Sequence, residues 1–311
     1  MNIKNAGLLG ILLALLLTGS NSVFAHRMYS KEVVFGDSLS DPGNAFALTG
    51  QFSVRPFTLI PDAPYARGGM HFSNGKTWAE VLAKRLHLPS GPAFRNPVRF
   101  SNYAIGGARA RSVTGGDLTD QVSAYLGQHN SVADPKALYV ILIGGNDVRD
   151  AIVAFQTDPT GDTSGQILQA AVTSVADNLQ SLAAAGAQHF LIGNAPNLAL
   201  VPAVLQQGAL AQFLAQLSSV QYNAALDGTV DTLASAFSLD VKKLDIFALL
   251  QSLVSNPKQL GLTDVTDTCI HPGVIVHAVC RDTDDYLFWD GIHPTHTVHK
   301  YIARTALHLL H

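Results

Sequence analysis

Short apolar runs rich in β-branched residues alternate along this chain with longer segments of helical periodicity, and Gly, Asn or Asp follows most of the runs. Such alternation indicates parallel strands joined by crossover helices. The expected strands are residues 32–35, 99–105, 137–143, 189–192 and 238–242. The expected helices are residues 77–86, 118–126, 164–185, 204–233, 245–253 and 296–311, with Gly186 as the C-cap of the third. We therefore predict an α/β fold, a three-layer α/β/α sandwich with a doubly wound, five-stranded, mainly parallel sheet, which would bind ligands beyond the carboxyl ends of its strands.

The N-terminus has the pattern of a cleavable export signal. Lys4 precedes an apolar run over residues 6–17, and Val23 and Ala25 occupy the small-residue positions before a cleavage site after Ala25. A retained membrane anchor is the alternative, but a spanning helix needs about 20 apolar residues and this run is shorter. We expect residues 1–25 to be a signal peptide and the mature protein to be secreted or periplasmic.

The overall composition is typical of a globular protein without a basic excess. Hydrophobic residues make up 47% of the chain and charged residues 14%, and the formal net charge is −3. Binding to the phosphate backbone of nucleic acids requires a basic surface, so nucleic acid is not an expected partner. No repeat or charged linker marks a boundary, and we expect residues 26–311 to form a single, monomeric domain.

Residues 256–285 are expected to form one long irregular loop, and they contain both cysteines, Cys269 and Cys280. The turn signals NP and HPG support this interpretation. An exported protein favours a disulfide between the two cysteines, whereas two buried free thiols are the alternative. Loops of this length are often lids or binding loops, which predicts a place near the functional site.

Two turns that follow expected strands carry candidate functional residues. Ser38 lies in FGDSLSDPGN, where Gly36 lets the backbone turn and a helix start can direct amides toward an anion. A helix cap without chemistry is the alternative for this Asp-Ser pair. In NYAIGGA, Gly106 and Gly107 can expose backbone N–H groups to an oxyanion, or they can simply form a tight turn.

The run ILIGGND follows the most apolar of the expected strands and supplies Asn146, whose side-chain amide presents two N–H donors. Such an amide, directed at a tetrahedral intermediate, is worth about 3–4 kcal/mol of barrier in a comparable hydrolase. The alternative is a helix cap, a position that suits Asn146 and particularly Asp147.

The run FWDGIHPT places Asp290 and His293 three residues apart, with Gly291 between them. A turn at this spacing brings the carboxylate to one imidazole nitrogen and leaves the other nitrogen for Ser38. His293 would then take the proton of Ser38 and return it to the leaving alcohol, as in a Ser-His-Asp triad.

Further histidines follow at three-residue steps, beginning with His296 and His299. No cysteine pattern or acidic cluster completes a zinc set with them, so we expect no metal site. His308 and His311 are expected to be exposed residues of the C-terminal tail.

Taken in order, GDSLSD, NYAIGGA, GGND and DGIHP resemble the four sequence blocks of the GDSL (SGNH) hydrolase family, and they span residues 35–294. The resemblance implies the flavodoxin-like SGNH fold and a triad of Ser38, Asp290 and His293. It also implies an oxyanion hole formed by Ser38, Gly107 and Asn146. Ester cleavage would proceed through an acyl-enzyme, without a metal or an organic cofactor.

Secreted bacterial members of this family include phospholipases, lysophospholipases, lipid acyltransferases and general esterases, and the four blocks do not separate them. The resemblance therefore implies an ester substrate, with lipids and transient contact with a membrane surface as our first expectation. Residues 256–285 resemble the variable region that tailors substrates. A non-catalytic binding protein of the same fold is an alternative from another class, but it would not need a serine, an Asp-x-x-His pair and two oxyanion-type loops together.

Overall fold

The computed structural model describes residues 28–311, and the predicted signal peptide lies outside this part of the chain. Its main sheet contains four parallel strands in the order β1 (Glu32–Gly36), β2 (Leu138–Leu142), β3 (His189–Gly193) and β4 (Asp240–Leu244). The strands end in register, because Gly36 pairs with Leu142, which pairs in turn with Gly193, and Gly193 pairs with Leu244. Four chain segments therefore leave the sheet side by side at one edge.

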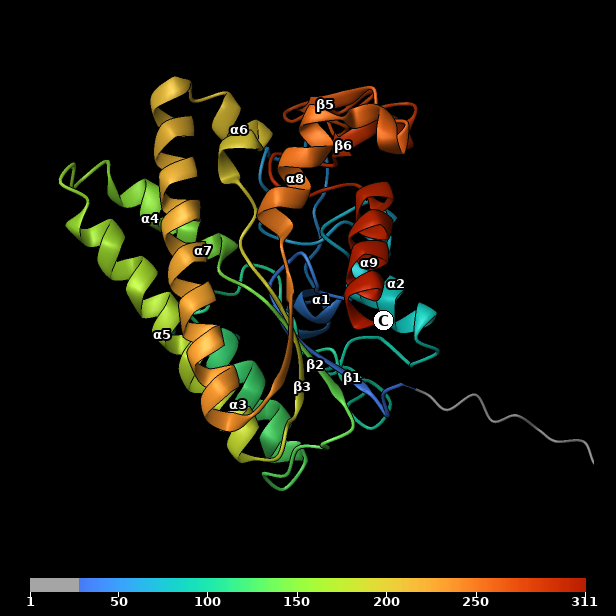
Figure 1. The fold of residues 1–311 in the computed structure, drawn as a ribbon. Helices are drawn as coiled ribbons and strands as arrows, with labels where there is room; N and C mark the ends of the chain where they lie inside the picture. The colour runs from blue at the N-terminus through green and yellow to red at the C-terminus, as the bar shows by residue number, and fades with distance from the viewer. Residues whose placement is uncertain (1–27) are drawn as a thin grey trace, which may run out of the picture.

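Helices cover both faces of this sheet. In Figure 1, α3, α5 and α7 lie on one face, and α2 and α9 lie together on the other. The helices are α1 (Asn44–Thr49), α2 (Trp78–Arg85), α3 (Leu118–Gln128), α4 (Gly145–Ala154), α5 (Asp162–Ala184), α6 (Pro202–Leu205), α7 (Ala209–Phe237), α8 (Ile246–Ser255) and α9 (His296–Leu310). Short 3-10 turns span Ala66–Gly68, Leu198–Leu200, Pro257–Leu260 and Thr283–Asp285. The predicted three-layer α/β architecture is confirmed.

The sheet has four strands instead of the five we expected. Residues 99–105 run parallel to β1 on its open edge, where the N–H of Tyr103 donates to the carbonyl of Val34 at 2.7 Å and the N–H of Ile105 to that of Gly36 at 3.1 Å. The ladder is interrupted between these bonds, because the N–H of Gly36 donates to Oε1 of Gln121 at 2.8 Å and not to the neighbouring backbone. A side chain of α3 therefore replaces the bond that would have continued the strand.

Several element boundaries differ from those expected. The helix expected over residues 204–233 is divided at Gly208 into α6 and α7, and β4 begins two residues later than predicted. Helix α5 ends one residue earlier than predicted, with Ala185 and not Gly186 as its C-cap, and Gly186 follows with φ 113°. Helices α1 and α4 were not among the expected helices.

The stretch from 256 to 285 is more regular than predicted. It contains β5 (Asp264–Thr268), which pairs in parallel with β6 (Tyr286–Phe288) in a separate two-stranded sheet. Cys269 and Cys280 form a disulfide, as expected, and both are buried beside Tyr65 and Trp289. Among residues 28–311, no helix combines the length and the apolar character that a membrane crossing requires.

Candidate active site

Ser38, His293 and Asp290 lie in one line of hydrogen bonds. The Oγ atom of Ser38, two residues after β1, lies 2.8 Å from Nε2 of His293. Nδ1 of His293 lies 2.9 and 2.8 Å from Oδ1 and Oδ2 of Asp290. The three residues are only 9%, 5% and 0% exposed, so these bonds are shielded from water. Such an arrangement can pass the proton of the serine hydroxyl to the imidazole while the carboxylate holds the ring.

The carboxylate of Asp290 is fixed by the turn that follows β6. Oδ1 accepts hydrogen bonds from the backbone N–H groups of Ile292 at 2.9 Å and His293 at 2.8 Å. Oδ2 accepts a hydrogen bond from the phenol of Tyr65 at 3.0 Å. The three-residue spacing thus becomes a turn in which one carboxylate binds both the backbone and the ring of His293.

Three groups with available N–H donors line the cavity that contains Ser38 and His293. The backbone N–H groups of Ser38 and Gly107 form no hydrogen bond within residues 28–311. Gly107 has φ 83°, a conformation that side-chain-bearing residues rarely adopt, and it is exposed at the turn. Asn146 donates one side-chain N–H to the carbonyl of Ala108 at 2.9 Å and retains the second. The arrangement can receive an anionic oxygen.

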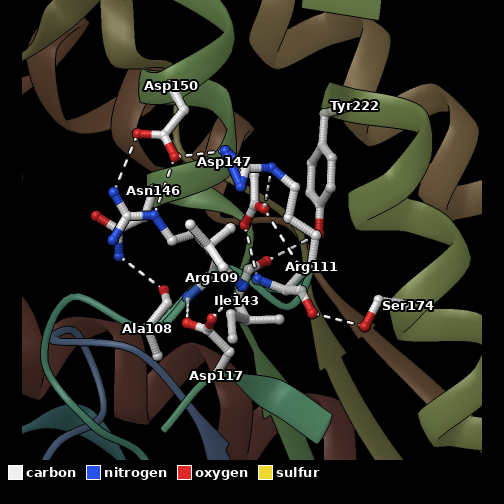
Figure 2. A network of polar contacts seen from close by, with 12 residues as sticks. Ala108, Arg109, Arg111, Asp117, Ile143, Asn146, Asp147, Asp150, Ser174 and Tyr222 are labelled. Atoms are coloured by element: carbon white, nitrogen blue, oxygen red, sulfur yellow. Dashed lines mark hydrogen bonds and ion pairs between the residues drawn. The ribbon is translucent and has the colours of Figure 1, made fainter. Parts of the chain in front are cut away.

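A polar network attaches the segment that follows Gly107 to α4, and Figure 2 shows its members Ala108, Arg109, Arg111, Asp147 and Asp150. Nε and Nη2 of Arg109 donate to the two carboxylate oxygens of Asp150 at 2.9 and 3.1 Å, and Nη1 donates to the carbonyl of Gly107 at 2.9 Å. Asp147 accepts hydrogen bonds from the backbone N–H groups of Ala110 at 2.7 Å and Arg111 at 3.4 Å. These bonds fix the position of Gly107 relative to Asn146.

The interpretation of Asp147 as a helix cap was wrong. Helix α4 is preceded by Gly144, with φ 113°, at the N-cap position, and Asn146 and Asp147 lie inside the first turn. The Asp147 side chain points instead to the backbone of the neighbouring loop. Burial raises the pKa of this carboxyl to about 6 against the opposing effect of the two backbone donors.

Asp41 joins the serine loop to the glycine turn. Its carboxylate is fully buried and accepts hydrogen bonds from the backbone N–H groups of Gly43, Ala45 and Gly106 at 2.7, 3.0 and 2.8 Å. Burial raises the pKa of Asp41, and these donors oppose the shift. The loops that carry Ser38 and Gly107 are therefore held by one carboxylate.

The cavity over Ser38 has a volume of about 290 Å³ and a mixed lining. Its apolar members are Leu39, Ile60, Pro61, Phe72, Pro196, Leu198 and Ile292. The ring of Phe72 packs against His293 with centroids 5.4 Å apart. Among the described residues of 256–285, none lines this cavity; the stretch instead packs behind Asp290, through Tyr65 and Trp289.

Comparison with known proteins decides the family. The sequence profile described as GDSL-like lipase/acylhydrolase matches residues 33–306, which contain all the residues of this site. The chain belongs to this family. It is accordingly a carboxylic ester hydrolase of the GDSL (SGNH) type.

The relatives of this GDSL hydrolase are distant but cover nearly all of it. A GDSL esterase/lipase of Arabidopsis thaliana is 26% identical over 90% of this chain and 89% of its own. A thermolabile hemolysin of Vibrio parahaemolyticus is 25% identical over 89% of this chain and 63% of its own. Among solved structures, an acetylxylan esterase of Geobacillus stearothermophilus aligns over 91% of this chain and 95% of its own, with 15% identity and a TM-score of 0.44.

Charged groups of both signs line the cavity of this GDSL hydrolase: the acidic residues Asp37 and Asp62, and the basic residues Arg109 and Arg149. Asp37 is buried, which raises its pKa to about 6, although a backbone hydrogen bond from Leu39 at 3.0 Å opposes the shift. The cavity is therefore not a purely apolar acyl pocket.

His296 and His299 each form a hydrogen bond with the backbone around the start of α2. Nδ1 of His296 lies 2.8 Å from the carbonyl of Lys76, and His299 is buried, with Nδ1 accepting the backbone N–H of Trp78 at 3.3 Å. Within residues 28–311, no group of three or more His, Cys, Asp or Glu side chains is arranged to hold a metal ion. His308 and His311 are exposed, as predicted.

Sequence reasoning brought together Ser38, Gly107, Asn146 and the Asp290–His293 pair, but it missed the residues that support them. Tyr65 and Phe72 lie in a loop that has no recognisable sequence motif. Their contacts with Asp290 and His293 depend on the path of that loop in the folded protein. Asp41, Arg109 and Arg149 lie in or beside the four motifs, so their charge was a signal that we did not interpret.

Proposed function

We propose that this GDSL hydrolase cleaves carboxylic esters with Ser38 as nucleophile, His293 as general base and acid, and Asp290 as the group that orients His293. The observation that carries the proposal is the unbroken line of hydrogen bonds from Ser38 Oγ through His293 to Asp290, at a cavity lined by Gly107 and Asn146. We further propose that residues 26–311 act as one monomeric domain.

The reaction follows from this geometry in two acyl-transfer steps. Ser38 Oγ attacks the ester carbonyl carbon while Nε2 of His293 takes the hydroxyl proton. The negative oxygen of the tetrahedral intermediate accepts hydrogen bonds from the N–H of Ser38, the N–H of Gly107 and Nδ2 of Asn146. His293 returns the proton to the departing alcohol, and a water molecule then cleaves the acyl-enzyme by the same route. The sequence of steps needs neither a metal nor an organic cofactor.

Acyl esters of lipids are the substrate class that we propose. Support comes from the apolar lining contributed by Leu39, Ile60, Phe72, Leu198 and Ile292, since an acyl chain gains free energy when it leaves water. Two other outcomes use the same site: hydrolysis of short-chain esters only, and transfer of the acyl group to a lipid hydroxyl in place of water. The lipid proposal includes transient contact with a membrane surface.

Export of the enzyme is also part of the proposal. It rests on the sequence pattern of residues 1–25, with cleavage after Ala25 and a secreted or periplasmic mature protein. The N-terminal sequence of protein recovered from the medium or periplasm tests it, and a protein that keeps residue 1 in the cytosol would contradict it.

The experiment that tests the proposed reaction compares wild type, Ser38→Ala and His293→Ala on short and long nitrophenyl esters, a phospholipid and a lysophospholipid. We expect either substitution to lower kcat by about four to six orders of magnitude, because triad members act as a unit. Cleavage of long-chain or lysophospholipid esters supports the lipid proposal, and cleavage of short esters alone replaces it with a general esterase. Cleavage that persists in Ser38→Ala contradicts the mechanism, and no cleavage by wild type favours a binding protein.

A further inference from the structure

Arg149 is a cation at the cavity that the proposed mechanism does not use. It lies on α4, three residues after Asn146, and both residues line the cavity over Ser38. Within residues 28–311 its guanidinium forms no hydrogen bond and no ion pair. Its neighbours contrast with it, because Arg109 and Arg111 both bind Asp150. Arg109 and Arg149 both line the cavity, but only Arg109 is paired with a carboxylate, so Arg149 is the cavity-lining arginine without an ion pair among residues 28–311.

The charged groups around Arg149 do not fully neutralise its positive charge. The charged groups that act on it are Arg109, Asp150, Asp37 and Asp62. Burial, and then the neighbouring charge of Arg109, lower the pKa of Arg149, so its surroundings disfavour its charge. Asp150 is already held by the other two arginines, and Asp37 accepts a backbone hydrogen bond from Leu39. A partly buried guanidinium in such surroundings is stabilised by an anion that enters from the cavity.

The position of Arg149 limits where that anion would lie. Residues three apart on a helix project from the same face, with Cβ atoms roughly 5–6 Å apart. Arg149 and Asn146 therefore lie on one face of α4 and line the same cavity, and in the proposed mechanism the Asn146 amide faces the scissile carbonyl. Its planar set of five N–H donors matches the oxygens of a phosphate or a carboxylate, which it can bind through two hydrogen bonds.

We propose that Arg149 is a specificity-determining residue that binds an anionic oxygen group, a phosphate or a carboxylate, located a few bonds from the scissile ester. This inference rests on the proposed function, because it takes the ester to be held at Ser38, Gly107 and Asn146. The enzyme then prefers esters with a nearby negative charge over neutral esters of the same size and chain length.

Two matched pairs of esters test this inference and distinguish the two anions. One pair is the nitrophenyl ester of glutaric acid with its second carboxyl free or methylated. The other is a lysophosphatidic acid and the monoacylglycerol of the same chain length. The readout is the ratio of kcat/KM for the anionic ester to that for the neutral ester. We expect wild type to favour the anionic member of at least one pair, and the pair that responds identifies the anion as carboxylate or phosphate.

Three variants assign the preference to Arg149. Arg149→Gln should lower the ratio about 10- to 100-fold, the loss expected when charge-assisted hydrogen bonds are removed. Arg149→Lys should give an intermediate ratio, because it keeps the charge but loses the planar donor set. Arg95→Gln makes the same change of charge at an exposed residue outside this cavity and should leave the ratio at the wild-type value.

The outcomes separate this inference from the proposed function. A wild-type ratio near one for both pairs overturns the inference. So does an Arg149→Gln variant in which kcat/KM falls by the same factor for both esters of a pair. If Arg149→Gln fails to fold, the ratio of Arg149→Lys, which keeps the positive charge on α4, is compared with that of wild type. Cleavage of the neutral esters by Ser38→Ala would instead contradict the proposed function, whatever the value of the ratio.

Discussion

The phenol of Tyr65 donates a hydrogen bond to Oδ2 of Asp290 at 3.0 Å, across 225 positions of sequence. The Tyr65 ring also packs edge-on against Trp289 with centroids 5.6 Å apart, and against Phe57 at 5.4 Å. Trp289 precedes Asp290 directly and belongs to the buried cluster around the Cys269–Cys280 disulfide. The loop containing Tyr65 and the disulfide region thus meet at the carboxylate that orients His293.

Tyr65→Phe removes this hydrogen bond and keeps the packing of the ring. We expect kcat to fall about 5- to 30-fold, because a hydrogen bond to a charged group contributes about 1–2 kcal/mol while Asp290 keeps its backbone donors. Steady-state hydrolysis of a nitrophenyl ester measures the effect. Tyr103→Phe, which removes a phenol that donates to Gln128, is the matched control and should retain wild-type kcat. Equal losses in the two variants would contradict a role of the Tyr65 hydroxyl.

Removal of the disulfide should affect stability and not substrate choice. Cys269→Ala with Cys280→Ala opens a short covalent loop, for which we expect a loss of about 2–3 kcal/mol in the free energy of unfolding. Chain-length preference should stay at the wild-type value, because no residue from 256–285 lines the cavity. Urea unfolding and a series of nitrophenyl esters of increasing length measure the two effects. A changed preference would show that this region reaches the substrate.

Gly144→Ala should disturb the start of α4. A Cβ atom at this position would lie 2.2 Å from Oη of Tyr222, and the φ of 113° disfavours any side chain. We expect a loss of more than about 2 kcal/mol in stability and a lower kcat, since α4 carries Asn146. Gly228→Ala, in the interior of α7 with open space around it, is the control and should be neutral or stabilising by up to about 1 kcal/mol. Similar unfolding midpoints for the two variants would contradict the steric argument.

The buried carboxyl of Glu32 should make the stability of the protein depend on pH. Its carboxyl is 2% exposed and forms no hydrogen bond with residues 28–311, and burial, followed by the charge of Glu80, raises its pKa well above the ordinary value. The folded state therefore retains a proton that the unfolded chain releases, so Glu32 lowers stability progressively as the pH rises above the unfolded pKa of about 4.3. Glu32→Leu should stabilise the protein by about 1–3 kcal/mol at pH 8, and by less at pH 4.5.

Chemical unfolding of the Glu32→Leu variant at the two pH values measures this effect. Glu80 provides a contrast, because it is also buried but binds Nε2 of His71 at 2.6 Å, so Glu80→Gln should destabilise the protein. A stability gain from Glu32→Leu that is the same at pH 4.5 and pH 8 would contradict the assignment of the effect to the Glu32 carboxyl.

The fold was predictable where local pattern and long-range contacts agree. The runs that became β1, β2 and β3 are buried and apolar, so periodicity alone located them within a few residues. Residues 99–105 show the same pattern, but their pairing with β1 depends on the Gln121 side chain, which pattern reasoning does not reveal. Strand β5, with the sequence DVTDT, is mostly polar and becomes a strand only through its pairing with β6.

The candidate site was predictable to the extent that it follows the strands. Parallel strands that end in register bring Ser38 and Asn146 to one edge, and Gly107 follows the segment beside β1, so motif order and topology together locate them. The role of Tyr65 could not be inferred in this way, since it depends on the path of a loop far from Asp290 in sequence. Arg149 shows a further limit: its charge is evident in the sequence, but its lack of a partner is a property of the folded molecule.

The bond between Ser38 and His293 joins positions 255 residues apart. A polypeptide that ends between residues 38 and 292 contains Ser38 but lacks His293, the base of the proposed mechanism. Under the proposed mechanism such shortened chains cleave no ester, so the ratio of turnover to total antigen in a preparation reports the fraction of molecules that extend at least to His293 and have folded.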